Sequence, residues 1–179
     1  WHKMAVEERG LKNIPTTADA LPALREESVQ KLFERTGVLS PVELESRYEV
    51  YAEQYILSIE VEAKLVVDMA KTMIYPAAIH YLSELSMVNS SMAEMGVEMD
   101  NSIAQKVAAE ANAMIVAAGK LSTAMENHDF ASTEEHMQYC AKKVRSLMDE
   151  VRSHADTLET EVDDELWPLP KYQEMLFIK

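Results

Sequence analysis

Apolar residues recur at intervals of three and four along most of the chain, which is the spacing of an amphipathic α-helix rather than of a strand. The clearest helix start is Ser40-Pro41-Val42-Glu43, where a serine cap, a proline at N1 and a glutamate at N3 can form a capping box. Pro76 is expected to kink this helix near Thr72 without ending it, so the helix should continue to about Leu85. Its apolar seam is predicted at positions 44, 48, 51, 55, 59 or 62, 66, 69 and 73.

Two more long helices are predicted by the same spacing. Residues 86–101, rich in Ser, Asn and Met around Gly96, indicate a loop before the second helix. Ser132 and Glu135 form another capping box at the start of the third helix, which should end before Trp167. The apolar positions are 103, 107, 111, 114, 118, 121 and 125 in the second helix, and 137, 140, 144, 147, 151, 154 and 158 in the third.

The two ends of the chain predict shorter elements. Pro15 keeps the residue before it out of the helical region, so residues 1–17 are expected to be a non-helical lead-in. Thr17 or Asp19 is predicted to cap a short helix that has Pro22 in its first turn. A second short helix is predicted to end at Gly37. Residues 166–179 carry large apolar side chains that need a docking surface: Trp167, Leu169, Tyr172, Met175, Leu176 and Phe177.

Together these elements predict an all-α fold. It consists of an up-down bundle of three long helices with short N-terminal helices over residues 18–165, followed by an apolar docking tail over residues 166–179. The chain of 179 residues contains only four glycines, too few for the turns and bulges of a sheet protein. Twelve methionines agree with the helical prediction, since methionine loses little on entering a helix.

Charge and composition limit the kinds of partner and the cell compartment that we expect for this chain. The formal net charge of −14 argues against nucleic acid, whose phosphates would be repelled. No run of 18 apolar residues and no signal peptide is visible, so neither a membrane nor an oxidising compartment is expected, and we predict a cytoplasmic protein. Cys140 is the single cysteine. The chain begins with Trp1 rather than Met, which is typical of a segment taken from a larger protein.

Candidate sites for chemistry fail on spacing or ligand count. No histidine has a glutamate three residues before it, as a di-iron bundle requires. His136 and Cys140 lie four residues apart and could supply half of a zinc site, but a second cysteine is missing, and an inert buried thiol is favoured. His154 on the seam and Glu62 beside it are interpreted as a hydrogen-bonded core histidine and a paired helix-edge carboxylate. We therefore predict no catalytic, cofactor-binding or metal residue.

Two stretches carry a more specific signal. The first covers residues 11–71 and includes LKNIPTTADALPAL, KLFERTGVLSPVELESRYE and IEVEAKLVVDMAK, and the second is the final LWPLPKYQEMLFIK. Both resemble the C-terminal region of type III glutamine synthetases, the large-subunit class of that enzyme. Their proline and aromatic patterns are distinctive, whereas the middle helices match only weakly.

The resemblance implies a parent enzyme that uses ATP and a divalent Mg or Mn ion to join ammonia to glutamate in ring-shaped homo-oligomers. Its metal-binding glutamates would lie in a catalytic domain before Trp1, so none is carried over to this chain. The implied partners are that catalytic domain and neighbouring subunits, and the implied role is structural. An alternative is a free-standing coiled-coil interaction or signalling bundle, which the heptad seams and the Ala-, Ser- and Met-rich residues 86–126 also fit.

Overall fold

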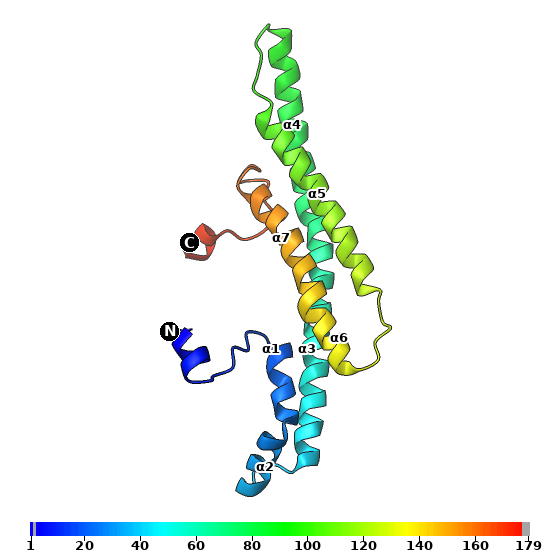
Figure 1. The fold of residues 1–179 in the computed structure, drawn as a ribbon. Coiled ribbons are helices and arrows are strands. Elements are labelled where there is room, and N and C mark those ends of the chain that lie inside the picture. Colours follow the sequence, from blue (N-terminus) through cyan, green and yellow to red (C-terminus); the bar gives the residue numbers. More distant parts are fainter. Residues whose placement is uncertain (2, 177–179) are drawn as a thin grey trace. The chain divides into compact units, whose positions relative to one another are not determined.

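The computed structural model describes residue 1 and residues 3–176, and the regular elements of this part of the chain are all helical, as predicted (Figure 1). Two compact units make up the chain. The first unit comprises residues 1–61 and 128–144, and the second comprises residues 62–127 and 145–179. Phe177, one of the predicted docking residues, lies outside the described part.

The first unit is built mainly from short helices against the start of one long helix. It holds η1 (Met4–Glu8), α1 (Thr17–Ala20), η2 (Leu21–Arg25), α2 (Glu27–Thr36), the first part of α3 (Pro41–Met69), α6 (Thr133–Tyr139) and η4 (Cys140–Val144). The π-helical turn η1 was not predicted, because residues 1–17 were expected to be non-helical.

Local capping chemistry fixes most helix boundaries of the first unit. Ser40 and Glu43 form the predicted box, since the Ser40 N–H donates to the Glu43 carboxylate at 2.7 Å and the Glu43 N–H donates to Ser40 Oγ at 3.4 Å. Gly37 ends α2 with φ of 67°, as predicted. The predicted cap of α1, Thr17 or Asp19, was wrong. The cap is Thr16, whose side chain accepts a hydrogen bond from the Asp19 N–H.

The predicted seam of the helix that begins at Pro41 was wrong at most positions beyond Tyr48, although Ile59 is buried as one of the predicted alternatives. Tyr51 and Met73 are exposed, while five alanines that were not counted as apolar are buried. From Tyr48 onward the main line of buried positions repeats at intervals of four, four and three, a period of 11 residues rather than seven. After Leu44, this line consists of Tyr48, Ala52, Ile56, Ile59, Ala63, Val67, Ala70, Ile74 and Ala78, and Ala77 is buried beside it.

The second unit contains the long helices of the chain. Its elements are the end of α3, η3 (Ala70–Ile74), α4 (Tyr75–Glu94), α5 (Ser102–Met125), α7 (Arg145–Glu159) and α8 (Tyr172–Leu176). The helix does continue through Pro76, as predicted. It does so by a π-helical turn in which the Tyr75 N–H donates to the Ala70 carbonyl, one residue farther back than in an α-helix.

The predicted loop over residues 86–101 was too long. α4 runs to Glu94, so only residues 95–101 connect it to α5. Gly96, at φ of 78°, closes α4 because its N–H donates to the Ala93 carbonyl and the Val97 N–H donates to the Met92 carbonyl. Serine, asparagine and methionine had indicated a loop, yet the helix persists until the residue that can adopt the left-handed conformation.

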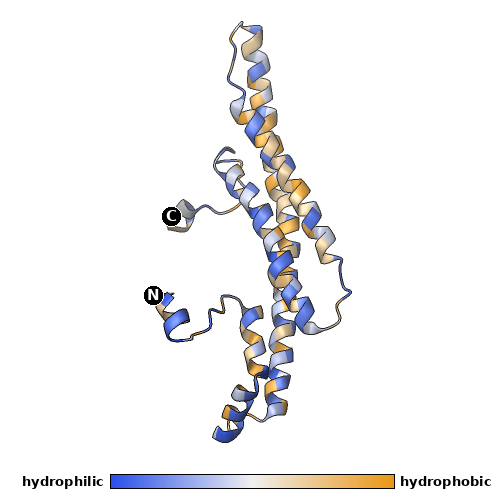
Figure 2. Ribbon diagram, viewed as in Figure 1, coloured by the Kyte–Doolittle hydropathy of each residue, from blue (hydrophilic) through white to orange (hydrophobic). Residues whose placement is uncertain are grey.

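The seams of the second and third long helices agree with the prediction at most positions, although Ile103 is exposed. α5 buries Val107, Ala111, Met114, Ala118 and Leu121 toward its neighbours, and α7 buries Leu147, Val151 and Leu158. Figure 2 shows that α5 is coloured mainly in the hydrophobic half of the scale, whereas α7 carries more hydrophilic residues. Ser132 caps α6 as predicted, with its side chain accepting the Glu135 N–H at 3.2 Å.

The tail divides into a buried and an exposed part. Trp167 is only 8% exposed and belongs to the core of the second unit. Met175 and Leu176 on α8 are exposed, so the apolar surface of the described tail lies at its end. Trp167 therefore packs within its own unit, and the docking role of the tail stays a prediction.

Candidate functional site

The most connected side chain of the first unit is Arg25, at the end of η2. Its guanidinium lies 3.8 Å from the centroid of the Tyr48 ring, and Tyr48 is fully buried in α3. The Arg25 Nε donates to both carboxylate oxygens of Glu45, at 3.1 and 3.0 Å. A further nitrogen donates to Glu49 at 2.8 Å, and Glu134 on α6 lies 3.7 Å away. We call Arg25, Glu45, Glu49, Tyr48 and Glu134 the Arg25 cluster.

The electrostatics of the Arg25 cluster favour the charged forms. The hydrogen bonds from Arg25 hold the pKa of Glu45 below its ordinary value, and those bonds raise the pKa of Arg25 itself. A planar guanidinium can stack on a ring and bond a carboxylate through two nitrogens at once, which an ammonium cannot do. The cluster thus joins η2, α3 and α6, and every charge in it has a partner inside the unit.

A second group of polar side chains lines an open groove of about 500 Å³ in the first unit. The His136 ring is stacked on Phe130, with centroids 4.2 Å apart, and His136 Nε2 lies 3.3 Å from Glu60. The remaining lining residues are Glu53, Ile56, Leu57, His128, Ser132 and Thr133. The Phe130 and Glu60 contacts orient the imidazole, as structural histidines often are oriented.

Cys140 lies one turn from His136 and is buried. Burial raises the pKa of the Cys140 thiol to about 11, and the charge of nearby Glu60 adds to the effect. A metal ligand or nucleophile needs the thiolate, which this environment disfavours. The structure thus brings His136, Cys140 and Glu60 near one another. No three His, Cys, Asp or Glu side chains in the described part of the chain are arranged to hold a metal ion.

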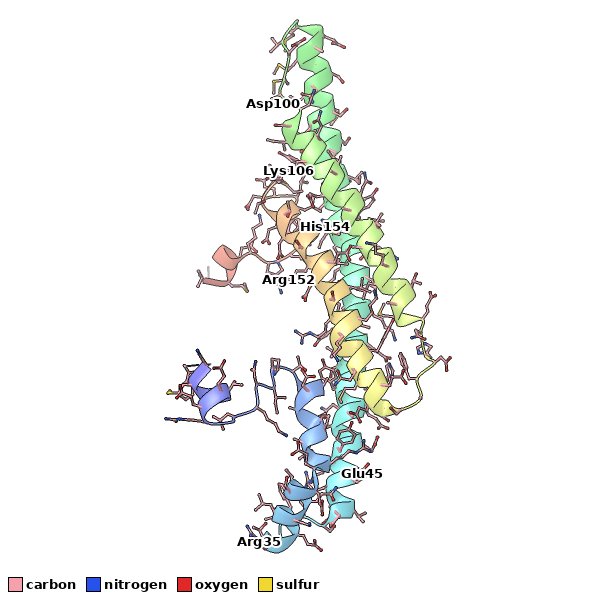
Figure 3. All side chains as sticks on the ribbon, viewed as in Figure 1. Arg35, Glu45, Asp100, Lys106, Arg152 and His154 are labelled. Atoms are coloured by element: carbon pink, nitrogen blue, oxygen red, sulfur yellow. The ribbon has the colours of Figure 1, made fainter. Side chains whose placement is uncertain are left out.

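His154 and Glu62 occupy different surroundings. His154 Nδ1 on α7 lies 2.7 Å from the Glu110 carboxylate on α5, and both side chains are about one quarter exposed. Glu62 is exposed on α3. The structure does not bring it near His154, His136 or Cys140 in any hydrogen bond or ion pair that it describes. Figure 3 shows His154 on α7, between Arg152 and Lys106 in the view.

Sequence reasoning missed the Arg25 cluster altogether. Arg25 follows a short apolar segment, and its partners lie 20 and 24 residues later in the chain, with Glu134 farther still. No periodic spacing connects these positions. The one available signal was Tyr48, a large side chain with a polar tip on an otherwise apolar seam. Such a side chain needs neighbours that can pack against the face of its ring.

The contacts described so far tie helices together within each unit. Residues 1–93 match the family described as "Glutamine synthetase C-terminal domain". The chain belongs to this family. The ionic and aromatic contacts of the Arg25 cluster thus lie in the matched part, apart from Glu134.

Curated relatives are similar to this glutamine synthetase C-terminal domain along almost its whole length. The type-3 glutamine synthetase of Dictyostelium discoideum is 36% identical over 190 residues, which cover 100% of this chain and 25% of the relative. Glutamine synthetases of Bacteroides fragilis (strain YCH46) and Butyrivibrio fibrisolvens are 29% and 28% identical, with 99% of this chain and 26% of each relative covered. The chain spans about a quarter of the length of these relatives.

Among the described residues of this glutamine synthetase C-terminal domain, no helix is both long enough and apolar enough to cross a bilayer.

Proposed function

We propose that this chain is the helical C-terminal domain of a type III glutamine synthetase and that its role is structural. In the proposed parent enzyme, ATP-dependent ligation of ammonia to glutamate takes place in the catalytic domain. The observation that carries the proposal is the pattern of coverage, because the relatives match this chain along its whole length but only over a quarter of their own.

The side-chain geometry supports a structural role. The polar pairs Arg25 with Glu45 and His154 with Glu110 each join two helices, as contacts that hold a structural domain together do. We propose that ATP and the divalent metal are held by residues outside this chain. We also propose that the domain packs on the catalytic domain and on neighbouring subunits of a homo-oligomer in the cytoplasm.

The tail is the first segment to test for assembly. Truncation before residue 171 keeps Trp167 in its core position and removes exposed Met175 and Leu176. In the full-length enzyme, this truncation is expected to weaken the oligomer while the helical content of the domain stays unchanged. Size-exclusion chromatography with light scattering measures the first quantity and circular dichroism the second. An oligomer of unchanged size and stability would remove the tail from the proposal.

The parent reaction needs its own test. The full-length polypeptide that contains this chain is expected to form glutamine from glutamate, ammonia and ATP in the presence of Mg²⁺, and the chain alone is expected to show no heat of binding with ATP and Mg²⁺. Failure of the full-length protein to form glutamine would overturn the proposed activity. A free-standing signalling bundle, the competing interpretation, predicts instead a defined dimer of the isolated chain by sedimentation.

A further inference from the structure

The hairpin formed by α4 and α5 changes character along its length. Ala77 and Ala78 are the last buried residues of α4, and Val107 is the first buried residue of α5. Between them, residues 79–106 contain no buried side chain, although they include about 24 Å of helix on the α4 side alone. Figure 1 shows this part of the hairpin, coloured green, extending past the end of α7 within the second unit.

Large apolar side chains gather on this part of the hairpin, which we call the methionine tip. Met95 is 67% exposed and Met87 is 63% exposed. The exposed large apolar side chains of the tip are Ile79, Met87, Val88, Met95, Val97, Met99 and Ile103. Methionine is enriched at the cores of protein interfaces and adapts its unbranched side chain to irregular surfaces, so a tip of this composition indicates a protein contact.

The methionine tip is an ordered end rather than a frayed one. The Gly96 turn satisfies the last carbonyls of α4, and the side chains of Asn89 and Asn101 are hydrogen-bonded to each other across the two arms. Asp100 accepts the Ser102 N–H at 2.9 Å, and this bond lowers the pKa of the Asp100 carboxyl. A preorganised surface loses less conformational entropy on binding than a disordered one.

The charge of the hairpin selects the kind of partner. No lysine or arginine occurs between Lys71 and Lys106, while Glu84, Glu94, Glu98 and Asp100 lie in that interval. Figure 3 shows Asp100 on the loop at the end of the hairpin and Lys106 farther along α5. Between Lys71 and Lys106, the formal charges that lie beside these apolar side chains in the sequence are thus all negative. Two copies of the tip would bring like charges together, which disfavours their pairing.

We propose that the methionine tip docks on an apolar protein surface rimmed with Lys or Arg, and that this surface lies on a neighbouring subunit, in the part of the parent polypeptide outside these 179 residues. This inference rests on the proposed function for the identity of the partner. The relatives are about four times as long as this chain, so most of their surface is contributed by residues with no counterpart here.

Photo-crosslinking in the assembled full-length protein tests the contact directly. A photoreactive phenylalanine analogue replaces Met95, and the matched control carries it at Val116, which is 60% exposed on α5 but lies about 20 Å along the helix from Ile103. The expected product joins position 95 to a peptide outside residues 1–179 that contains apolar residues and Lys or Arg. The control is expected not to label that peptide. Products that join two tips, or no product at position 95, would overturn the proposal.

A substitution test gives the strength of the contact. Replacing Met87, Met95 and Met99 with Gln preserves side-chain length and helix propensity while making the surface polar. The triple variant of the full-length protein is expected to dissociate at a concentration about tenfold higher or more, with unchanged helical content. Val116→Gln serves as the control. Unchanged dissociation of the triple variant would contradict the proposal. Crosslinking and dissociation are measured without substrate, so a protein that fails to form glutamine can still pass or fail this test.

Discussion

The two units of the chain hold their helices together in different ways. The first unit adds the Arg25 cluster to its apolar core, and there one guanidinium bonds Glu45 and stacks on Tyr48. The second unit relies on an apolar seam in which Met114 and Leu121 of α5 and Leu158 of α7 are completely buried. An apolar seam is insensitive to pH and salt, while a charged cluster responds to both. The same chain therefore contains one unit that solution conditions can weaken and one that they affect less.

The largest expected effect falls on the apolar seam. Leu121→Ala leaves a cavity at a fully buried position, so we expect the second unit to lose about 2–5 kcal/mol of unfolding free energy. Urea unfolding followed by the fluorescence of Trp167 reports this loss, because Trp167 lies in the same unit. Trp1, which is 82% exposed, is replaced by Phe to remove its background. Val116→Ala, on the exposed face of α5, is expected to cost much less; equal losses would refute the assignment of the seam.

Breaking the Arg25 cluster should have the next largest effect. Arg25→Ala removes the ion pairs and the stacking on Tyr48, and we expect a loss of about 1–2 kcal/mol in the first unit. Arg25→Lys keeps the charge but not the planar fork, so an intermediate loss is expected. Circular dichroism during urea unfolding measures both. Ala substitution of exposed Arg35 on α2 is the control, and a loss there as large as at Arg25 would contradict the special role of the cluster.

The pH dependence of this loss sharpens the comparison. Because Arg25 holds the folded-state pKa of Glu45 below its ordinary value of 4.5, the pair stabilises the protein above about pH 4.5. That stabilisation is lost as the pH falls through the lower pKa of the folded state. The difference in stability between wild type and Arg25→Ala should therefore shrink between about pH 5 and pH 3. A difference that stays constant would mean that only packing on Tyr48 matters.

The smallest expected effect concerns Cys140. Burial raises the pKa of its thiol to about 11, so alkylation by iodoacetamide at pH 8 is expected to be much slower in the folded chain than in urea. The folded state should also lose stability as the pH rises from the ordinary thiol pKa of 9 toward 11, because the unfolded chain can release the proton more easily. Mass spectrometry follows the alkylation. Equal rates in both states would show that the thiol is accessible.

Much of the fold could be predicted because its signals are local. The Ser40 and Ser132 capping boxes, the Gly37 stop and the seams of α5 and α7 depend on residues within one or two helical turns of one another. The seam of α3 was misassigned because alanine carries its buried line at Ala52, Ala63 and Ala70. Alanine occurs both in protein cores and on protein surfaces, so its hydropathy alone does not predict whether it is buried.

The candidate site features were less predictable for a different reason. The contacts of Arg25 with Glu45 and of His154 with Glu110 join residues that are 20 and 44 positions apart. Spacing rules describe neighbours on one helix and say nothing about which helices meet. The methionine tip was similarly hidden, since methionine suits both a core and an interface, and only its exposure in the folded chain distinguishes the two.

The π-helical turn at Ala70–Ile74 has a consequence for how the length of this chain can change. Such a turn amounts to one extra residue in an α-helix, and each residue of an α-helix rotates the chain by about 100°. The π-turn absorbs this extra residue locally, because the Tyr75 N–H bonds the carbonyl five residues back in place of four. Deleting one residue there would therefore restore regular α-helix and leave the phase of α4 unchanged. A relative that lacks one residue between Ala70 and Ile74 should accordingly keep the same face of α4 buried.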